Sequence, residues 1–388
     1  MPQVLLENIG MLISGRLEEI ILDADAILVE NGLIAQVGNR RDMDVKKGAV
    51  VIDCNGTTVI PGLIDTHCHP VFGDFTPKQN QIGFLEGMLH GGVTTAISAG
   101  EIHLPGRPTD PAGVKALAIL AAKSYANFRP GGIKVEGGAV ILEKGLVEDD
   151  FREMSLEGVH LVGEIGLGSA KTVEEAGPMV RWAKKYGMTV MMHTGGTSMP
   201  GSSTITAEMV IAMDPDIVSH INGGTTAVSI RDITKLVTQT EYALEIVHCG
   251  NPKAAVETAL LAVQHDCLAR VIIGNDAPTG SGVIPLGMLR MLSFLASLSP
   301  ISAEQAVCLA TGNAARFFKM NRGKIQEGRE ADIVVMDAPV GSVGRDAISA
   351  IKIGDVPGVS LVMVDGEIKV GKSRNTPPAA RQVKISQL

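Results

Sequence analysis

Aromatic residues are scarce in this chain of 388 residues, where Phe, Tyr and Trp together make up only 3%. Single-stranded nucleic acids are commonly bound by stacking their bases on aromatic side chains, so this scarcity argues against such a surface. Basic residues are not in excess either, because 34 Lys and Arg stand against 42 Asp and Glu, giving a formal net charge of −8. A surface that follows phosphates needs the opposite balance. We therefore expect no nucleic-acid partner.

Cysteine and long apolar runs are also lacking. The five cysteines form no CxxC pair, which predicts neither a disulfide framework nor a zinc knuckle. The first ten residues have no basic segment and include Glu7, so we expect no signal peptide. The longest apolar stretch, 283–298, contains Pro285 and Arg290 and is shorter than a membrane span. These features predict a cytoplasmic protein without a membrane partner.

Glycine, in contrast, is abundant, with 45 residues in the chain, about 12% against a usual ~7%. No Pro-rich or Ser-rich tract accompanies it, so we expect tight turns and close backbone contacts rather than disorder. The chain also exceeds the roughly 250–300 residues at which a single core usually divides. Its length predicts two domains, or one large barrel with an attached module.

The two ends of the chain share short runs of alternating Val and Ile around turn sequences. We expect residues 1–60 and 322–388 to form one small β-sandwich module jointly, built of antiparallel strands. Asn-Gly and Asp-Gly pairs favour tight turns between strands. The three such pairs are Asn31-Gly32, Asn55-Gly56 and Asp365-Gly366.

Between these ends, residues 60–280 repeat a unit made of an apolar run, a polar or Gly-rich end and a longer helical stretch, and we expect residues 61–321 to form one domain. Continuous apolar strands separated by helices indicate a parallel sheet covered on its outer face. Eight evenly spaced units favour an α/β fold with a (β/α)8 TIM barrel; an open doubly wound sheet is the alternative. The eight runs span 60–69, 92–100, 132–138, 161–168, 189–196, 216–223, 244–250 and 270–278.

Polar residues gather at the carboxyl ends of these runs, where barrels of this kind carry their catalytic groups. His67 and His69 are two positions apart on one strand, so both imidazoles point to the same side. An isolated pair of this kind is more often structural, but other strands end in similar residues. These residues are His67, His69, Glu164, His193, His220, His248 and Asp276.

Two carboxylates in this set suggest a metal site. Glu164 lies within an apolar run, where an unpaired charge would be costly, so either a lysine or a cation must face it. Asp276 ends the eighth run, next to the first in a closed barrel, and either contacts a metal or forms a turn before Pro278. Four histidines with these carboxylates predict two divalent ions that activate water and polarise a carbonyl oxygen. His248 either binds substrate or caps its strand.

Several motifs resemble those of the amidohydrolase superfamily. They are PGLIDTHCH at 61–69, NDAP at 275–278, the single histidines at 193 and 220, and GKIQEGREADIVVMD at 323–337. The resemblance implies a metal-dependent hydrolase with His67, His69 and Asp276 on one ion, His193 and His220 on the other, and Glu164 across both. Many members use a carboxylated lysine where this chain has Glu164.

That glutamate, together with HGGVTTAISAG at 90–100 and SRNTPPA at 373–379, is similar to one member that opens a cyclic lactam. The resemblance implies hydrolysis of 1,4,5,6-tetrahydro-6-oxonicotinate to 2-formylglutarate and ammonia, as in nicotinate degradation. It also implies zinc and iron, or two zinc ions, and a homotetramer acting on a small-molecule substrate. In this mechanism a hydroxide that bridges the ions attacks the carbonyl, and Asp276 is the proton shuttle.

The substrate contacts and the exact activity have alternatives. His103 and Arg107 are the candidates for binding the substrate carboxylate, although loop arginines often have no such role, and His248 is a further candidate for contacting the substrate. Another cyclic amidase, similar to dihydroorotase or hydantoinase, would share the metal site. A deaminase is disfavoured because Gly196 stands where those members usually carry glutamate. A non-catalytic scaffold would have lost ligands, and all are present.

Overall fold

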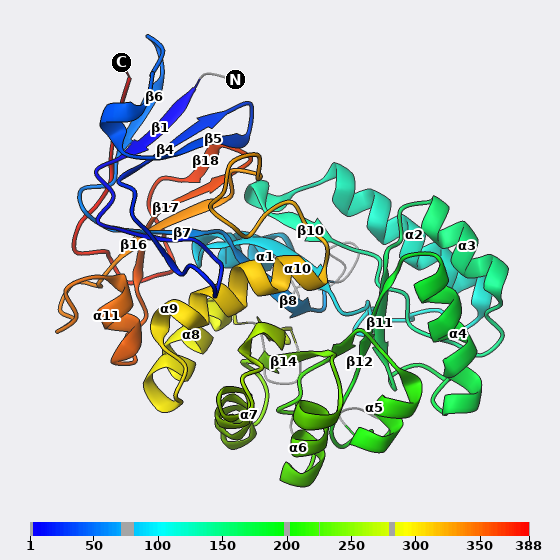
Figure 1. Cartoon of the computed structure of the whole chain (residues 1–388). Helices are drawn as coiled ribbons and strands as arrows, with labels where there is room; N and C mark the ends of the chain where they lie inside the picture. Colours follow the sequence, from blue (N-terminus) through cyan, green and yellow to red (C-terminus); the bar gives the residue numbers. More distant parts are fainter. Residues whose placement is uncertain (1–2, 71–80, 198–201, 225, 279–283, 388) are drawn as a thin grey trace.

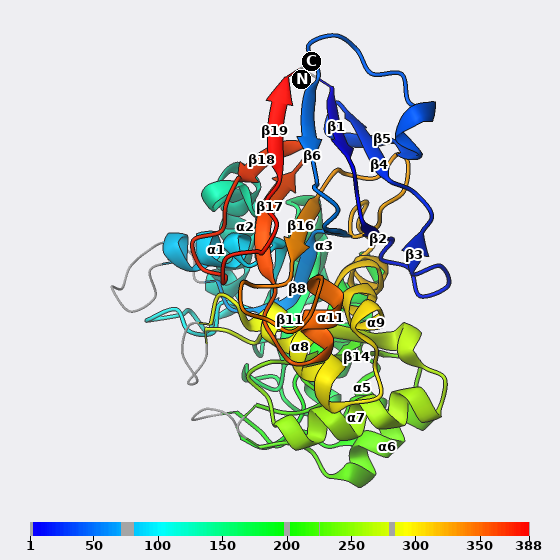
Figure 2. The same cartoon turned by 90° about the vertical axis from the view of Figure 1, so that its left-hand side faces the viewer.

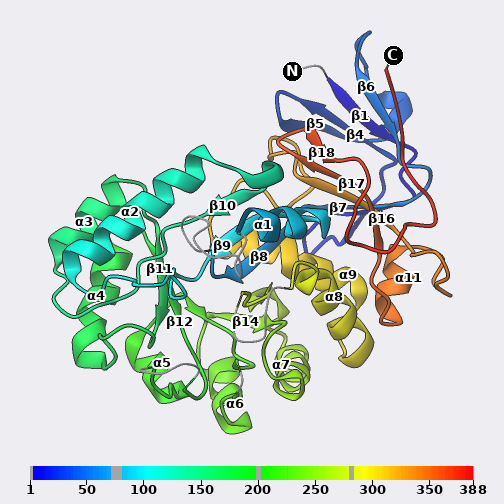
Figure 3. The ribbon, with the colours of Figure 1, turned by 180° about the vertical axis from the view of Figure 1, so that it is seen from behind.

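The structure is a computed structural model that describes residues 3–70, 81–197, 202–224, 226–278 and 284–387. Two stacked β-sheets lie at one end of the molecule, and a ring of strands surrounded by helices forms the rest (Figure 1). The same arrangement is seen from behind in Figure 3, where the helices follow the outer side of the ring. Within the described residues, no helix is both long enough and apolar enough to cross a membrane.

Eight parallel strands form the ring, as the eight apolar runs predict. Six neighbouring pairs are hydrogen-bonded within two sheets, ordered β10-β9-β8 and β11-β12-β13-β14-β15. Parallel bridges from Val140 to Val162 and from Cys68 to Ala277 join the two sheets and close the barrel. The (β/α)8 prediction is confirmed, and the open-sheet alternative is wrong. The strands are β8 (Leu63–Cys68), β9 (Val93–Ser98), β10 (Lys134–Glu136), β11 (Leu161–Ile165), β12 (Thr189–Met192), β13 (Ile217–Val218), β14 (Ala243–Val247) and β15 (Val271–Gly274).

Helices connect these strands, and local sequence fixes where several of them begin. The Asp110 side chain accepts a hydrogen bond from the Gly113 N–H at the start of α2, and Thr172 forms a capping box with Glu175 at α4. The helices are α1 (Gln81–His90), α2 (Pro111–Asn127), α3 (Glu148–Leu156), α4 (Val173–Lys185), α5 (Ala207–Met213), α6 (Ile230–Gln239), α7 (Pro252–Gln264), α8 (Gly287–Leu298), α9 (Ala303–Cys308), α10 (Ala314–Phe317) and α11 (Ala347–Lys352).

The barrel has an inner and an outer apolar layer. Side chains from the strands alternate between them, as the pleat of a strand requires. In β14, Ala243 belongs to the inner cluster, whereas Leu244 and Ile246 pack in the outer cluster that includes helix residues. Glu245 therefore shares the inner side with Ala243, and the position of this one charged residue matters for the site described below.

The sandwich is built from both ends of the chain. One sheet has the order β19-β6-β1-β4-β5 and the other β18-β17-β16-β7-β2-β3. The first and last strands, β1 and β19, lie on either side of β6, because both pair with it (Figure 2). The strands are β1 (Val4–Glu7), β2 (Met11–Ile13), β3 (Ile21–Leu22), β4 (Ala26–Glu30), β5 (Leu33–Gly38), β6 (Val50–Asp53), β7 (Thr58–Pro61), β16 (Ile333–Asp337), β17 (Gly358–Val364), β18 (Glu367–Val370) and β19 (Lys384–Gln387).

Two of the three turn sequences connect paired strands, and the third does not. Asn31-Gly32 joins β4 to β5 and Asp365-Gly366 joins β17 to β18, with positive φ at all four residues. Asn55-Gly56 has the same backbone, with φ of 54° and 69°, but it connects β6 and β7, which belong to different sheets. The expectation of purely antiparallel strands is also wrong, because β1 pairs with β6 and β2 with β7 in parallel. A strand that crosses to the other sheet need not reverse its direction.

Candidate metal centre

Six of the predicted residues meet at the carboxyl ends of five barrel strands. Each side chain comes from a strand or from the two residues that follow it, and each residue is between 0% and 6% exposed. Their ligand atoms form overlapping groups small enough to hold an ion. The six residues are His67, His69, Glu164, His193, His220 and Asp276.

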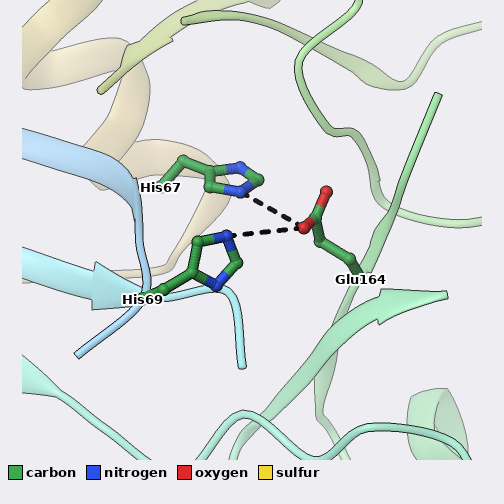
Figure 4. Close-up of side chains that lie close together, drawn as sticks. All are labelled: His67, His69 and Glu164. Atoms are coloured by element: carbon green, nitrogen blue, oxygen red, sulfur yellow. Dashed lines mark ion pairs between the residues drawn. The ribbon is translucent and has the colours of Figure 1, made fainter. Parts of the chain in front are cut away.

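One oxygen of Glu164 faces a first group of ligand atoms. Glu164 Oε2 lies 3.4 Å from His67 Nε2 and 3.6 Å from His69 Nε2. Both imidazoles reach from β8 and its end toward the carboxylate on β11 (Figure 4). Asp276 Oδ1 completes this group at 3.6 Å from His67 Nε2 and 3.3 Å from His69 Nε2.

The other oxygen of Glu164 faces a second group. Glu164 Oε1 lies 2.6 Å from His220 Nε2 and 3.7 Å from His193 Nδ1. These two imidazole nitrogens are 3.0 Å from each other. The carboxylate thus stands between two sets of donors, with one oxygen toward each, which is the arrangement that a shared ligand of two ions requires.

The donor atoms have the spacing that a bound ion needs, and one of them has no hydrogen-bond partner. Nitrogen and oxygen ligands at roughly 2.0–2.2 Å in a tetrahedral site lie about 3.3–3.6 Å apart, which matches the first group. His67 Nε2 is buried and makes no hydrogen bond in the described part of the chain. Burial opposes ionisation of Glu164, yet the imidazoles of His220 and His67 hold the pKa of this carboxyl well below its ordinary value. The residues therefore fit two divalent cations.

Hydrogen bonds on the far side of the rings orient three of the histidines. His69 Nδ1 lies 3.0 Å from the Gly100 carbonyl oxygen, and His193 Nε2 lies 3.2 Å from that of Gly196. His67 Nδ1 lies 2.7 Å from Glu245 Oε2. A ring nitrogen that donates to such an acceptor leaves the opposite nitrogen as a ligand.

Sequence reasoning missed Glu245. It lies inside the apolar run of β14 and is fully buried. The signal that could have revealed it is the one that identified Glu164, namely a lone carboxylate in an apolar strand.

Two of the six clustered residues have unusual backbone conformations. His220 has φ of +31° and Asp276 has φ of +58°, in the left-handed region that is costly for residues other than glycine. Backbone hydrogen bonds hold both: the Asp276 N–H donates to the His67 carbonyl at 2.7 Å, and the Gly223 N–H donates to the His220 carbonyl at 2.5 Å. Such conformations cluster at functional sites, since they aim side chains that regular strands would not.

The three predicted substrate contacts lie in different surroundings. The His103 ring is 5.2 Å from the His69 ring and perpendicular to it, so it borders the ligand groups. Burial, with a contribution from nearby His69, lowers the pKa of His103 to about 4, so this ring is neutral at physiological pH. Arg107 is paired with Glu143 at 2.7 Å, where the carboxylate side chain is only 1% exposed.

His248 lines a cavity of about 550 Å³, whose lining also includes Arg290, Phe294 and Leu298 of α8. None of the six clustered residues lines this cavity. Burial, with Arg290 nearby, lowers the pKa of His248.

A second group of carboxylates lies at the junction of barrel and sandwich and surrounds a lysine side chain. Glu330, Asp332 and Asp365 are close enough to bind an ion. Lys134 Nζ occupies their centre, at 2.6 Å, 2.9 Å and 2.7 Å respectively. This group is therefore an ion-pair cluster and not a metal centre.

Comparison with known proteins identifies the family. The sequence profile described as "Amidohydrolase family" matches residues 58–369, which is most of the chain. The chain belongs to the amidohydrolase family. The resemblance predicted from the strand-end motifs is thereby confirmed.

Individual family members are similar over the full length. Enamidase of Eubacterium barkeri is 55% identical over 385 residues, covering 99% of this chain and all of the relative. A crystal structure of enamidase, also 55% identical, superposes with a TM-score of 0.96 over 99% of this chain and 100% of that one. Imidazolonepropionase of Photobacterium profundum is 24% identical over 91% of this chain and 95% of its own length. The barrel and the sandwich are therefore a shared architecture.

Proposed function

We propose that this protein is a hydrolase that opens a cyclic amide at its C–N bond, with 1,4,5,6-tetrahydro-6-oxonicotinate as substrate. One water cleaves the amide and gives an enamine, which tautomerises to an imine and reacts with a second water, so that 2-formylglutarate and ammonia are the products. The observation that carries the proposal is the 55% identity with enamidase over both entire chains. The buried ligand groups around Glu164 support it, because hydrolysis in this family depends on metal. A glutamate shared by both groups also agrees with the expected departure from the lysine-bearing members.

The metal ions are proposed to be zinc and iron, or two zinc ions. His67, His69 and Asp276 would hold one ion and His193 and His220 the other, with Glu164 common to both. Imidazole and carboxylate donors suit either metal, so the donor set does not choose between them. Bound there, the ions would supply Lewis acidity toward the amide carbonyl and lower the pKa of a coordinated water.

Asp276 is the residue that we assign to proton transfer. Its Oδ1 faces His67 and His69, so Oδ2 is the atom that would receive the proton of the attacking water and return it to the ring nitrogen. Neighbouring imidazoles outweigh burial and lower the pKa of Asp276, so the carboxylate starts in the ionised form that a base requires. Conjugation of the ring nitrogen with the adjacent double bond would ease its departure.

For the substrate carboxylate we propose His103 first. Its ring borders His69, and a neutral imidazole can donate one hydrogen bond to a carboxylate. Arg107 would have to exchange its partner Glu143 for the substrate or bind both together. His248 faces a cavity that contains none of the ligand residues, and we leave it out of the proposed substrate site.

The remaining parts of the proposal concern assembly and setting. We propose a homotetramer that acts in the cytoplasm on a small molecule, with no nucleic-acid or membrane partner. Light scattering coupled to gel filtration tests the assembly: a mass near four times 40.7 kDa is expected, and a monomer or dimer would contradict it.

The activity is tested by incubating the purified, metal-analysed protein with 1,4,5,6-tetrahydro-6-oxonicotinate and measuring ammonia release. Dihydroorotate and hydantoin are tested as alternative substrates, since related cyclic amidases would share the metal site. Their ring opening releases no ammonia, so their loss is followed by chromatography. We expect ammonia from the first compound and turnover of the other two that is at least 100-fold slower. Faster hydrolysis of dihydroorotate or hydantoin would contradict the proposed substrate, and metal below about one ion per chain would contradict a catalytic site altogether.

A further inference from the structure

Glu245 is a buried carboxylate beneath the candidate metal centre. It lies on β14 and is 0% exposed. No lysine or arginine forms an ion pair with it among the residues that the structure describes. A carboxylate in such a place is costly unless other groups stabilise its charge.

Its contacts reach both ligand groups at once. Glu245 Oε2 lies 2.7 Å from His67 Nδ1 and accepts the backbone N–H of His220 at 3.1 Å. Oε1 accepts the Thr66 hydroxyl at 2.5 Å. His67 belongs to the first group and His220 to the second, so this one side chain connects residues at the carboxyl ends of two strands, β8 and β13, that are not neighbours in the ring.

The contact with His67 selects which ring nitrogen is free. An ionised glutamate can only accept, so Nδ1 must carry a hydrogen, and Nε2 is the only ring nitrogen that can offer a lone pair to a cation. His67 Nε2 is the atom that faces Glu164 and Asp276, and it is buried without a hydrogen-bond partner of its own in the described residues. The bond to Glu245 thus holds His67 in the tautomer that can bind a cation.

The charge of Glu245 adds to this effect. Two divalent ions bring four positive charges, whereas Glu164 and Asp276 supply only two negative ones. A third carboxylate at hydrogen-bond distance from a ligand increases the electron density on that imidazole and strengthens its bond to a metal.

We propose that Glu245 is a positioning residue: it fixes the tautomer of His67 and raises the affinity of the site for divalent cations. This inference rests on the metal centre of the proposed function. It does not rest on the identity of the substrate.

Glu245→Gln tests the effect of the negative charge of this side chain without changing how the side chain packs. The amide oxygen can still accept from His67 Nδ1 and the His220 N–H. The amide N–H₂ would face Thr66, whose hydroxyl also lies 3.0 Å from the Ile273 carbonyl and can donate there while accepting from the amide. The variant therefore keeps its shape and its hydrogen bonds and loses only the negative charge.

The experiment measures zinc binding in the absence of substrate. Metal-free protein is titrated with Zn²⁺ in competition with a chromophoric chelator, and the thermal midpoint of unfolding is recorded with and without the ion. We expect Glu245→Gln to bind the tighter of its zinc ions 10- to 100-fold more weakly than the unmodified chain. The metal-free variant is expected to melt within a few degrees of the metal-free parent, because its packing is unchanged.

Asp337→Asn is the matched control. Asp337 is a fully buried carboxylate on β16 in the sandwich and is paired with Arg381 at 2.7 Å. Removing its charge should lower the thermal midpoint and leave the zinc affinity unchanged. A zinc affinity of Glu245→Gln within twofold of the parent would overturn the inference, and so would an equal loss in the control.

A second variant keeps the inference testable if Glu245→Gln does not fold. Thr66→Val removes one donor to Glu245 with little change in volume, and we expect a two- to fivefold weaker zinc affinity. An unchanged affinity there, with Glu245→Gln unfolded, would also overturn the inference. A parent protein that binds two ions tightly but does not hydrolyse the lactam would contradict only the proposed substrate.

Discussion

The carboxylate at residue 276 has the environment of a proton carrier as well as that of a ligand. It is 6% exposed, and its ionised form is favoured by the neighbouring imidazoles. We predict that Asp276→Asn retains bound metal but loses at least 100-fold in turnover, because an amide cannot carry the proton to the leaving nitrogen. Elemental analysis and the ammonia assay on one preparation check both parts. More than a tenth of the parental rate would remove Asp276 from the mechanism.

A test of Arg107 as a substrate contact must account for the ion pair that this residue already forms with Glu143. Replacing it with alanine would leave the buried carboxylate of Glu143 without a cation, which we expect to cost about 3 kcal/mol of unfolding free energy. A raised KM in that variant would not separate substrate binding from this loss.

The double variant Arg107→Ala with Glu143→Gln removes both charges and should recover most of the stability. We predict that its KM exceeds that of Glu143→Gln alone by at least tenfold if Arg107 binds the substrate carboxylate. Urea unfolding and initial-rate kinetics on the three variants provide the comparison. Equal KM values in the single Glu143 variant and the double variant would exclude Arg107 as a substrate contact.

How far the sequence could predict single residues depends on whether a residue acts alone or through a partner. His67, His69 and Glu164 were identifiable because each ends or interrupts an apolar strand. The link from His67 to Glu245 was not, since it joins residues 178 positions apart. Such pairs depend on how the barrel closes, which no local pattern specifies.

At the scale of elements, the spacing of the apolar runs predicted the barrel strands, but the sequence did not indicate which strands of the sandwich pair with each other. Even β13, which has only two residues, followed from the regular interval between apolar runs. The turn at Asn55-Gly56 was recognisable from its residues. That it leads from one sheet to the other depends on which strands β6 and β7 pair with. Turn sequence determines the local backbone, and tertiary packing determines the partner.

Between β10 and β11, a half-exposed ion pair gives a prediction for pH. His160 Nε2 lies 3.3 Å from Glu136 Oε2. This hydrogen bond raises the pKa of His160 above 6.5 despite partial burial. Burial would raise the pKa of Glu136, but the contacts with His160 and Arg322 hold it below 4.5. The contribution of the histidine is therefore complete below pH 6.5 and is lost as the pH rises through its raised pKa, and that of the glutamate is lost under acid conditions.

We predict that His160→Gln lowers the unfolding free energy at pH 6 and has no effect at pH 9. The difference should stay below ~1 kcal/mol, because the histidine side chain is 48% exposed. Urea unfolding at the two pH values measures it. An effect that is equal at both, or larger at pH 9, would contradict a role for the charged imidazole.

At the scale of the whole molecule, we propose that residues 61–321 form the barrel and that residues 1–60 with 322–388 form the sandwich. The pairing of β7 with β16 supports this division, since it joins the last strand before the barrel to a strand that follows it. Lys134 on β10 fastens the two parts, because its carboxylate partners Glu330, Asp332 and Asp365 all lie in the C-terminal segment.

This lysine is buried together with one of its carboxylate partners. The Lys134 side chain is 4% exposed and that of Asp332 is 1% exposed, so their charges are shielded from water. Burial raises the pKa of Asp332 even with the lysine present. Without the lysine, Glu330 would keep Arg322 at 2.9 Å and Asp365 would keep Arg129 at 2.6 Å. Asp332 would have no ion-pair partner among the described residues, so it would have to take up a proton or move toward solvent.

We therefore predict that Lys134→Met costs about 3–5 kcal/mol of unfolding free energy at pH 7. Lys115→Met is the control: Lys115 also pairs with two carboxylates, Asp150 and Glu153, but its side chain is 25% exposed, and the loss should stay below ~1 kcal/mol. Adding Asp332→Asn to Lys134→Met should recover part of the stability by removing the buried charge. Urea unfolding followed by circular dichroism measures all four proteins. Equal losses of unfolding free energy in the two lysine variants would mean that the junction is held by apolar packing alone. A double variant less stable than Lys134→Met would contradict a destabilising effect of the unpaired Asp332 carboxylate.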